Sequence, residues 1–403
     1  MKNKKSLVIF PIIIIMICVL SGCKKQVDTK NITTNYYVTD NNRESKKETT
    51  SKSETTLDKE TTEYKETTSE KKTTEVKETT TKKETTVNKE TKNHEETTKN
   101  NVTPAKGIKK LHVSGTKLVD DKGNIVQLKG ISTHGISWFP QYINEKCFKY
   151  FHDKGADIIR LALYPDEYNG YSTGGNKNEL KQYVKNGVEY AAKNNMYVII
   201  DWHVHGEGNP NIHKEDAKEF FKEMASTYKD YNNVFYEICN EPCNGTTWSD
   251  IKKYAEEIIP VIRKYDKDGV IIVGTPNWSQ YVNEAAANPV KGYDNIMYTL
   301  HFYAGTHKEE LRNTMVNAIK AGLPVFVTEY GICDASGNGA IDEYQAGEWV
   351  KTMDKYNISY VMWNLSNKSE TSAVLNNWCN KVEGFTDEDL SPAGKWLIKQ
   401  LAK

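Results

Sequence analysis

Eight short apolar runs rich in β-branched residues recur between residues 125 and 365, and they constrain the fold more than any other feature. Charged, amphipathic stretches of helical length separate most of them. Strands that are apolar on both faces and alternate with helices are typical of a parallel sheet covered on its outside. The runs are Ile125–Thr133, Ala156–Tyr164, Tyr197–Val204, Asn233–Asn240, Val270–Thr275, Ile296–Tyr303, Pro324–Tyr330 and Ser359–Leu365.

Eight strand–helix units closed on themselves form a (β/α)8 barrel, so the sequence predicts an α/β chain of this class. An open, doubly wound sheet is the alternative, but such a sheet usually begins with a glycine-rich, phosphate-binding turn that this sequence lacks. The predicted helices include Lys181–Asn194, Lys214–Tyr228, Trp248–Lys264 and Ile341–Lys355.

Polar and aromatic residues gather at the C-terminal ends of these runs, where a barrel carries its chemistry. Glu241 follows Asn240 at the end of the fourth run, and Glu329 lies at the end of the seventh. Two carboxyl groups brought together by a barrel are what retaining glycoside hydrolysis needs, one to donate a proton and one to attack the sugar. The sequence therefore predicts a glycosidase.

Arg160 lies among isoleucine and leucine residues in the second run, so we expect it to be buried beside an anionic partner. His203 closes the third run, and His301 and Tyr303 close the sixth. A single strand-end histidine is more often a satisfied core residue. Two histidines in the same ring of strand ends as two glutamates favour a role in the site.

The first residues resemble an export signal. Three lysines precede an apolar run from Leu7 to Leu20, and Leu-Ser-Gly-Cys23 follows. This string resembles a bacterial lipobox, which predicts a lipoprotein-type signal peptide over 1–22 and a lipid anchor to the membrane on Cys23. The alternative is an ordinary secretory signal with a chance cysteine. We expect a cell-surface lipoprotein rather than a freely secreted protein.

Residues 23–104 are dominated by Lys, Glu and Thr, with Glu-Thr-Thr recurring at a period of six. That composition cannot bury enough apolar surface to fold, so it predicts a disordered linker before a catalytic domain over 105–403. The chain has a net charge of zero, so nothing in its charge indicates a nucleic-acid partner, and we expect none. The cysteine spacing suggests no metal site and no disulfide framework. We expect a monomer with no cofactor.

The strings Asn240-Glu241-Pro242 and Thr328-Glu329-Tyr330-Gly331, with His134-Gly135, Asp201-Trp202-His203 and Trp363-Asn364, resemble glycoside hydrolase family 5, and within it the bacterial endo-β-1,4-glucanases. The resemblance runs in order from Leu111 to about Leu401. It implies a (β/α)8 barrel that hydrolyses β-1,4-glucans with retention. It also implies Glu241 as the acid/base and Glu329 as the nucleophile.

By the same resemblance, Arg160, His301 and Tyr303 are candidate donors to an ionised Glu329. Asn240 is placed to bond the sugar 2-hydroxyl. The implied substrate-binding residues are His134, Trp138, Tyr164, Trp278, Trp363, Lys368 and Glu370, and His203 supports the site. Trp138 and Trp363 are expected on the glycone side of the cleaved bond, and Trp278 toward the aglycone side. Tryptophan faces suit this use because they stack on the C–H faces of glucose rings.

Other functions share this pattern. A mannanase, a xyloglucanase or a mixed-linkage β-glucanase would keep the same catalytic residues and differ only in its loops. An inactive glycan-binding surface protein is an alternative from another class. In an adhesin that works through the Thr-rich repeat, deletion of residues 24–103 would abolish function, whereas we expect catalysis on soluble substrate to survive it.

Overall fold

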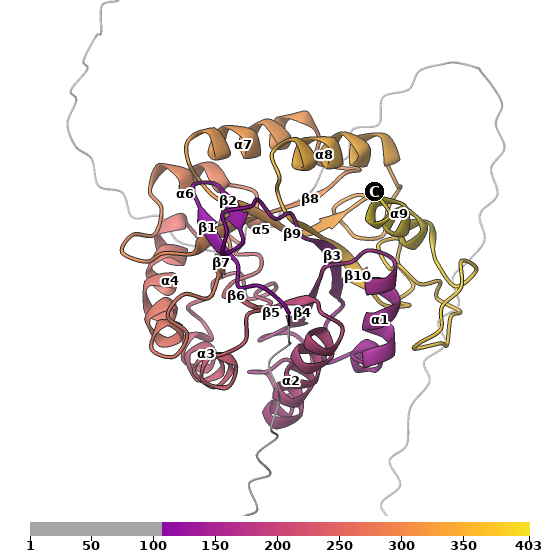
Figure 1. Cartoon of the computed structure of the whole chain (residues 1–403), viewed down its shortest axis with the longest axis horizontal. Helices are drawn as coiled ribbons and strands as arrows, with labels where there is room; N and C mark the ends of the chain where they lie inside the picture. Colours follow the sequence, from indigo (N-terminus) through magenta and orange to yellow (C-terminus); the bar gives the residue numbers. More distant parts are fainter. Residues whose placement is uncertain (1–106) are drawn as a thin grey trace, which may run out of the picture. The chain divides into compact units, whose positions relative to one another are not determined.

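A computed structural model of the chain describes residues 107–403, so the predicted signal peptide, Cys23 and the linker lie outside the described residues. Eight parallel strands close into a barrel in the order β10-β3-β4-β5-β6-β7-β8-β9 (Figure 1). The predicted α/β barrel is therefore confirmed. The strands are β3 (Lys129–Thr133), β4 (Ile158–Leu163), β5 (Tyr197–Trp202), β6 (Val234–Glu237), β7 (Ile271–Val273), β8 (Ile296–Tyr303), β9 (Val325–Gly331) and β10 (Tyr360–Leu365).

Helices surround the barrel on its outside (Figure 1). Their apolar faces pack on the strands, and as a result each strand is buried along nearly its whole length. Within residues 107–403, no helix is both long and apolar enough to cross a bilayer. The helices are α1 (Glu145–Asp153), α2 (Lys177–Lys193), α3 (Lys214–Tyr228), α4 (Trp248–Arg263), α5 (Pro276–Ser279), α6 (Val282–Ala287), α7 (Glu309–Lys320), α8 (Glu343–Lys355) and α9 (Pro392–Leu401), with a 3-10 turn at Pro140–Tyr142.

Side-chain caps mark the starts of α2 and α4. The side chain of Thr247 accepts the amide of Asp250, whose carboxylate accepts the amide of Thr247, and this capping box begins α4 as predicted. Helix α2 begins four residues before the predicted Lys181, because Asn176 caps it and Lys177–Leu180 continue its pattern. The predicted range missed that first turn.

A short antiparallel hairpin, β1 (His112–Ser114) with β2 (Lys117–Val119), was not predicted. In Figure 1 it lies in front of the barrel strands. Leu111 and Leu118, next to and within it, share one buried cluster with the first inward residues of the barrel strands. The hairpin therefore covers the N-terminal mouth and leaves the opposite mouth for the site.

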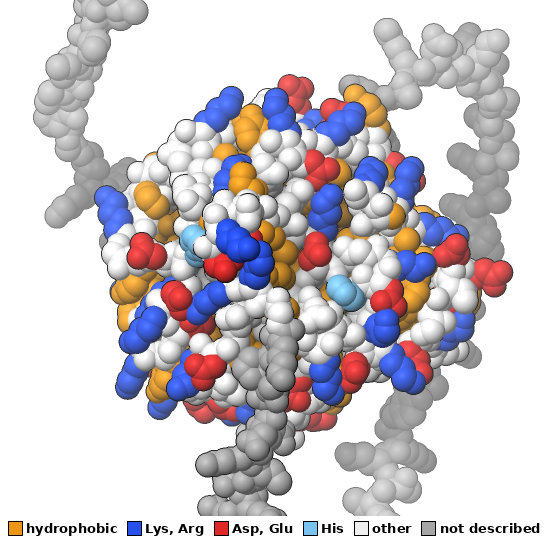
Figure 2. All heavy atoms as spheres, viewed as in Figure 1, with side chains coloured by type: hydrophobic (Ala, Val, Ile, Leu, Met, Phe, Trp, Pro, Cys, Tyr) orange, Lys and Arg blue, Asp and Glu red, His pale blue; other side chains and the backbone are white. Residues whose placement is uncertain are grey.

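On the face drawn in Figure 2, basic and acidic side chains are interspersed.

The barrel interior is layered. At its N-terminal end, the cluster beneath the hairpin includes Ile158, Ile199 and Phe235. Two residues further along the same three strands, the inward positions are the buried charged residues Arg160, Asp201 and Glu237. An apolar layer of side chains thus lies beneath a layer of charged side chains, and the functional cleft lies on the other side of the charged layer.

Candidate active site

A cleft of about 750 Å³ opens at the C-terminal ends of the barrel strands, where the sequence predicts the chemistry. All but two of the predicted site residues line it. The exceptions are Arg160 and Asn240, which are fully buried. The lining residues that were predicted are His134, Trp138, Tyr164, His203, Glu241, Trp278, His301, Tyr303, Glu329, Trp363, Lys368 and Glu370.

Arg160 lies at the centre of the charged layer and is completely buried. Its Nε and Nη2 donate to both carboxylate oxygens of Glu237, at 2.7 and 3.2 Å. Its Nη1 donates to Glu329 at 3.1 Å, and Nη2 lies 3.1 Å from Asp201. Burial alone would lower the pKa of Arg160, but these carboxylates outweigh it and raise the pKa. The expected anionic partners of Arg160 are thus present.

Glu237 was not singled out by the sequence analysis. It lies inside the fourth apolar run, four residues before Glu241, and it is fully buried. The signal was present: a carboxylate in an otherwise apolar strand requires a cationic partner, and Arg160 in the second run requires an anionic one. Both residues lie inside their apolar runs and not at the ends of those runs, where the functional residues were expected.

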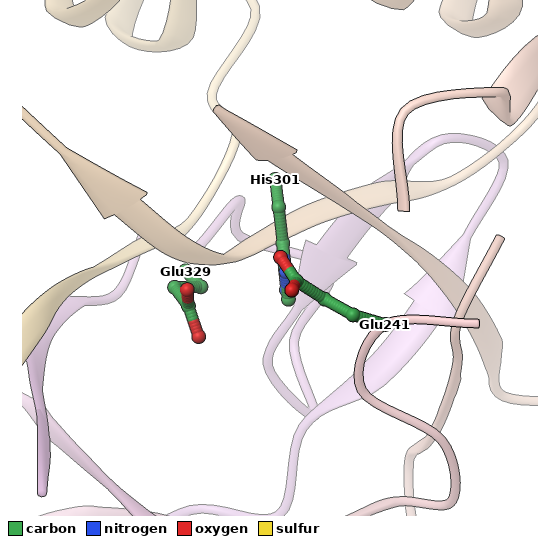
Figure 3. A group of neighbouring side chains, drawn as sticks. All are labelled: Glu241, His301 and Glu329. Atoms are coloured by element: carbon green, nitrogen blue, oxygen red, sulfur yellow. The ribbon is translucent and has the colours of Figure 1, made fainter. Parts of the chain in front are cut away.

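Glu241 comes from the loop after β6, and its carboxylate meets Nδ1 of His301, on β8, at 2.9 Å (Figure 3). Nε2 of the same ring lies 2.9 Å from the hydroxyl of Thr328. That hydroxyl donates its one hydrogen to Glu237, at 2.7 Å, so it accepts from His301 Nε2–H. The ring of His301 is thus held between Thr328 on its Nε2 side and the Glu241 carboxyl group on its Nδ1 side.

Glu329, on β9, faces Glu241 across the cleft (Figure 3). One oxygen accepts from Arg160, and the other accepts the Tyr303 hydroxyl at 2.8 Å. His301 differs from its expected role as a donor to Glu329, since its ring bonds Glu241 and Thr328 instead. Burial raises the pKa of Glu329, and the Glu241 carboxyl adds to the rise. His301, Arg160 and the Tyr303 hydrogen bond oppose it.

Glu241, His301 and Glu329 also form, within residues 107–403, the group that could hold a metal ion, since one ligand atom of each lies within 4.8 Å of the others. Two carboxylates and an imidazole suit a zinc or manganese ion. However, Glu241 and His301 are hydrogen-bonded to each other, and Arg160 and Tyr303 bond Glu329. These contacts give each of the three side chains a hydrogen-bond partner without an ion. The expectation of a metal-free site stays a prediction.

Two further histidines are held in neutral form by their surroundings. Burial lowers the pKa of His203 well below its ordinary value, and the Arg160 charge adds to this. Its Nδ1 lies 2.6 Å from Asp201. Burial and the nearby Lys368 lower the pKa of His134 to about 4. Both rings are therefore uncharged at neutral pH, and they present hydrogen-bonding edges to the cleft.

Aromatic side chains form one wall of the cleft. Trp363 stacks with His203 at 5.2 Å between ring centroids and 20° between planes. Trp138 packs on Tyr164 at 4.7 Å. On the same wall, Lys368 forms an ion pair with Glu370 at 2.7 Å. Trp278 stands apart from this wall, after β7, and is 43% exposed. Apolar faces and polar groups in one cleft suit a polyhydroxylated ligand.

Asn240 is fully buried and held by two hydrogen bonds, and its expected bond to the sugar 2-hydroxyl stays a prediction. Its side-chain oxygen accepts from Arg160 at 2.6 Å, and its amide nitrogen donates to the carbonyl of Val204 at 3.0 Å. The amide keeps one further N–H. His205 and Glu167, which also line the cleft, form a pair at 3.0 Å. They lie in the loops that follow β4 and β5.

Comparison with known proteins agrees with this geometry. The family model for cellulase, glycosyl hydrolase family 5, matches residues 119–369. Endoglucanase A of Butyrivibrio fibrisolvens is 49% identical over 298 residues, 73% of this chain and 69% of that protein. An endoglucanase of Clostridium saccharobutylicum is 48% identical over 296 residues, 72% of this chain and 65% of that protein. Part of each relative thus lies outside the match.

Solved structures show the same likeness. The catalytic domain of Thermobifida fusca endoglucanase Cel5A, in a complex with cellotetraose, matches with a TM-score of 0.70 and 39% identity. The match covers 73% of this chain and 97% of that one. The family model spans more than half of the chain, and it includes the whole barrel from β3 to β10. The chain belongs to the cellulase family, glycosyl hydrolase family 5, and is a glycoside hydrolase.

Proposed function

We propose that the protein is an endo-β-1,4-glucanase that cleaves internal bonds of cellulose and related β-glucans with retention. Glu241 is the acid/base and Glu329 the nucleophile. The observation that carries this proposal is the pair of buried carboxyl groups, with one oxygen of each within 4.8 Å. Direct attack on the sugar requires carboxyl groups about 5–5.5 Å apart, whereas inversion requires about 6.5–9.5 Å to admit a water molecule.

In the first step, Glu329 attacks C1 of the sugar while Glu241 protonates the departing glycosidic oxygen. His301 supports this assignment, because its ring, anchored by Thr328, holds the Glu241 carboxyl group in place at 2.9 Å. Arg160 and Tyr303 hold the Glu329 carboxylate by one oxygen each and so fix its direction of attack. The sugar becomes an ester of Glu329, and the shortened chain leaves with a new hydroxyl group.

In the second step, Glu241 acts as a base. Esterification removes the negative charge of Glu329, and the proton of Glu241 has left with the first product. Its carboxylate then takes a proton from water, which attacks C1 and releases the sugar. Glu329 regains its charge beside Arg160 and Tyr303. Each residue thus ends the cycle in its starting form.

The substrate class follows from the cleft walls. Trp138, Trp363 and Trp278 offer apolar surfaces to the faces of successive glucose rings, while Lys368 and Glu370 offer hydrogen bonds to sugar hydroxyls. Relatives named endoglucanase and a similar structure that holds cellotetraose support glucan over other polymers.

The test is to incubate the full chain with carboxymethylcellulose and measure new reducing ends. Proton NMR then follows the anomeric form of the first product released from a cello-oligosaccharide. We expect activity, with the β-anomer appearing first. First release of the α-anomer would contradict retention. Activity on mannan, xyloglucan or mixed-linkage glucan alone would move the proposal to one of the same-fold alternatives, and binding without cleavage would favour a glycan-binding protein.

A Tyr303→Phe substitution should change the pH profile. The nucleophile must be ionised, so kcat/KM falls as pH drops through the pKa of Glu329. The Tyr303 hydrogen bond lowers that pKa, and its loss should move the acid limb to higher pH. We also expect a fall in kcat/KM of about ten- to a hundredfold at the optimum, since the bond is to a charged group. The control is Tyr344→Phe, an exposed tyrosine on α8.

We further propose that Cys23 carries lipid and that a single copy of the chain is displayed at the cell surface. The lipobox-like Leu20-Ser21-Gly22-Cys23 and the linker composition support this arrangement. Metabolic labelling of producing cells with a fatty acid tests it, with Cys23→Ser as the control. Label in the wild-type chain and none in the variant is the expected result. An unlabelled, fully released wild-type protein would favour ordinary secretion.

A further inference from the structure

A second groove adjoins the cleft on the side of Trp278. It has a volume of about 520 Å³ and lies between the segment that carries α5 and α6 and the helix α7. Gln280 lines both the cleft and the groove, so the two adjoin at this side chain. In Figure 1 this side of the barrel is where α6 and α7 pack together.

The chain enters this region through an unusual turn. Asn277, Trp278 and Ser279 have φ angles of 58°, 54° and 55°, three consecutive left-handed residues that are not glycine. Such a backbone is disfavoured for residues with a Cβ, and it persists only where the surroundings fix it. Strain of this kind gathers at binding sites, and here it sets the direction of a tryptophan in the cleft.

Two hydrogen bonds tie this turn to the backbone on either side of Glu241. The Ser279 hydroxyl donates to the carbonyl of Asn240 at 2.5 Å, and the amide of Trp278 donates to the carbonyl of Pro242 at 3.0 Å. The backbone that carries Trp278 is therefore fixed relative to the backbone that carries Glu241. A ligand that rests on Trp278 and continues along the turn meets Gln280 and then the groove.

The groove has the surface chemistry of a sugar-binding site. Tyr281 lines it and is 44% exposed, nearly the same fraction as Trp278. Asn283 and Asn317 supply amides for hydroxyl groups, and Leu311 supplies apolar surface. The charged residues among those lining the groove are the glutamates 284 and 310, which disfavours an anionic polymer. Exposed aromatic side chains are common singly, but two in four residues on adjoining surfaces indicate a ligand.

We propose that this groove binds the aglycone portion of a long β-glucan chain, beyond the sugar that rests on Trp278. Tyr281 provides the stacking surface there. This inference rests on the proposed glucanase function and adds a specificity determinant to it. It explains how the enzyme favours internal bonds, since only a chain with several sugars on the aglycone side reaches the groove. Long substrates gain binding from it, and short ones do not.

The test is Tyr281→Ala in the full chain, assayed on a long, uncharged cello-oligosaccharide and on an aryl cellobioside. We expect the ratio of kcat/KM for long over short substrate to fall about five- to tenfold, the scale of one lost aromatic contact. The loss should appear in KM rather than kcat, because the groove binds ground state and transition state alike. Tyr344→Ala, which removes an exposed tyrosine on α8, should leave the ratio unchanged.

Each other outcome has a definite meaning. An unchanged ratio in Tyr281→Ala overturns the groove proposal and leaves the glucanase function standing. An equal fall at every substrate length also overturns it, because Tyr281 would then act through the turn. If the wild-type chain cleaves no glucan, the proposed function fails. Calorimetry then measures the binding of a long cello-oligosaccharide to the wild-type chain and to Tyr281→Ala. Weaker binding to the variant would support the groove proposal, and equal binding would overturn it.

Discussion

A Glu329→Gln substitution should lower kcat on carboxymethylcellulose by about ten-thousandfold or more, or about 5 kcal/mol of barrier. Glutamine keeps the size of the side chain. Its amide oxygen can still accept from Arg160, and its NH2 group can donate to the Tyr303 hydroxyl, so the site should stay folded. It cannot form the glycosyl ester, because its amide nitrogen and oxygen are poor nucleophiles. The loss should therefore lie in kcat, with KM nearly unchanged.

The measurement is release of reducing ends by the full chain, with thermal unfolding recorded in parallel. Glu256→Gln, an exposed glutamate on α4, is the matched control and should retain full activity. Near-normal activity in Glu329→Gln would remove Glu329 as the nucleophile. A large loss of activity together with a large fall in Tm would indicate a structural role instead, since the carboxylate is one of the partners of buried Arg160.

The barrel and the strand-end residues of its site could be predicted from two general features of parallel barrels, whereas the substrate-binding residues were implied by the family resemblance alone. Inward and outward residues alternate along a strand, and parallel strands bring their C-terminal ends to one mouth. Glu241, His301 and Glu329 therefore meet although the sequence separates them widely. The predicted ranges were wrong chiefly at the ends: the first barrel strand begins at Lys129 and not at Ile125, because Ile125 pairs with Val119 instead.

The features that the sequence did not reveal depend on tertiary contacts. Glu237 lies inside the fourth apolar run, and its partner Arg160 is 77 residues away. Thr328 belongs to a recognised string, yet its role in fixing the His301 ring depends on a three-way contact with Glu237. The left-handed turn at Trp278 has no glycine to mark it, because packing against Asn240 and Pro242 imposes it. A local pattern can mark Glu237 as a buried carboxylate that needs a cation, but it does not show which distant residues make these contacts.

Replacing Arg160 by methionine should destabilise the protein by about 3–5 kcal/mol at neutral pH. The variant keeps much of the side-chain volume but leaves Asp201, Glu237 and Glu329 without their shared cation, fully or almost fully buried. Burial already raises the pKa of Asp201 and of Glu329, and Arg160 opposes the rise in both. Without it, those carboxyl groups should take up protons on folding, and the uptake should depend on pH.

The sign of that dependence is a sharper test than the loss alone. An acid whose pKa is higher in the folded than in the unfolded state stabilises the fold less as pH rises between the two values. The Arg160→Met defect should therefore be largest near neutral pH and smaller in mild acid, as measured by urea unfolding at several pH values. Arg312→Met, which removes a contact with Gln345 on the helix surface, should cost less than about 1 kcal/mol at every pH. A defect in Arg160→Met that is independent of pH would mean that packing, rather than charge, determines the role of this arginine.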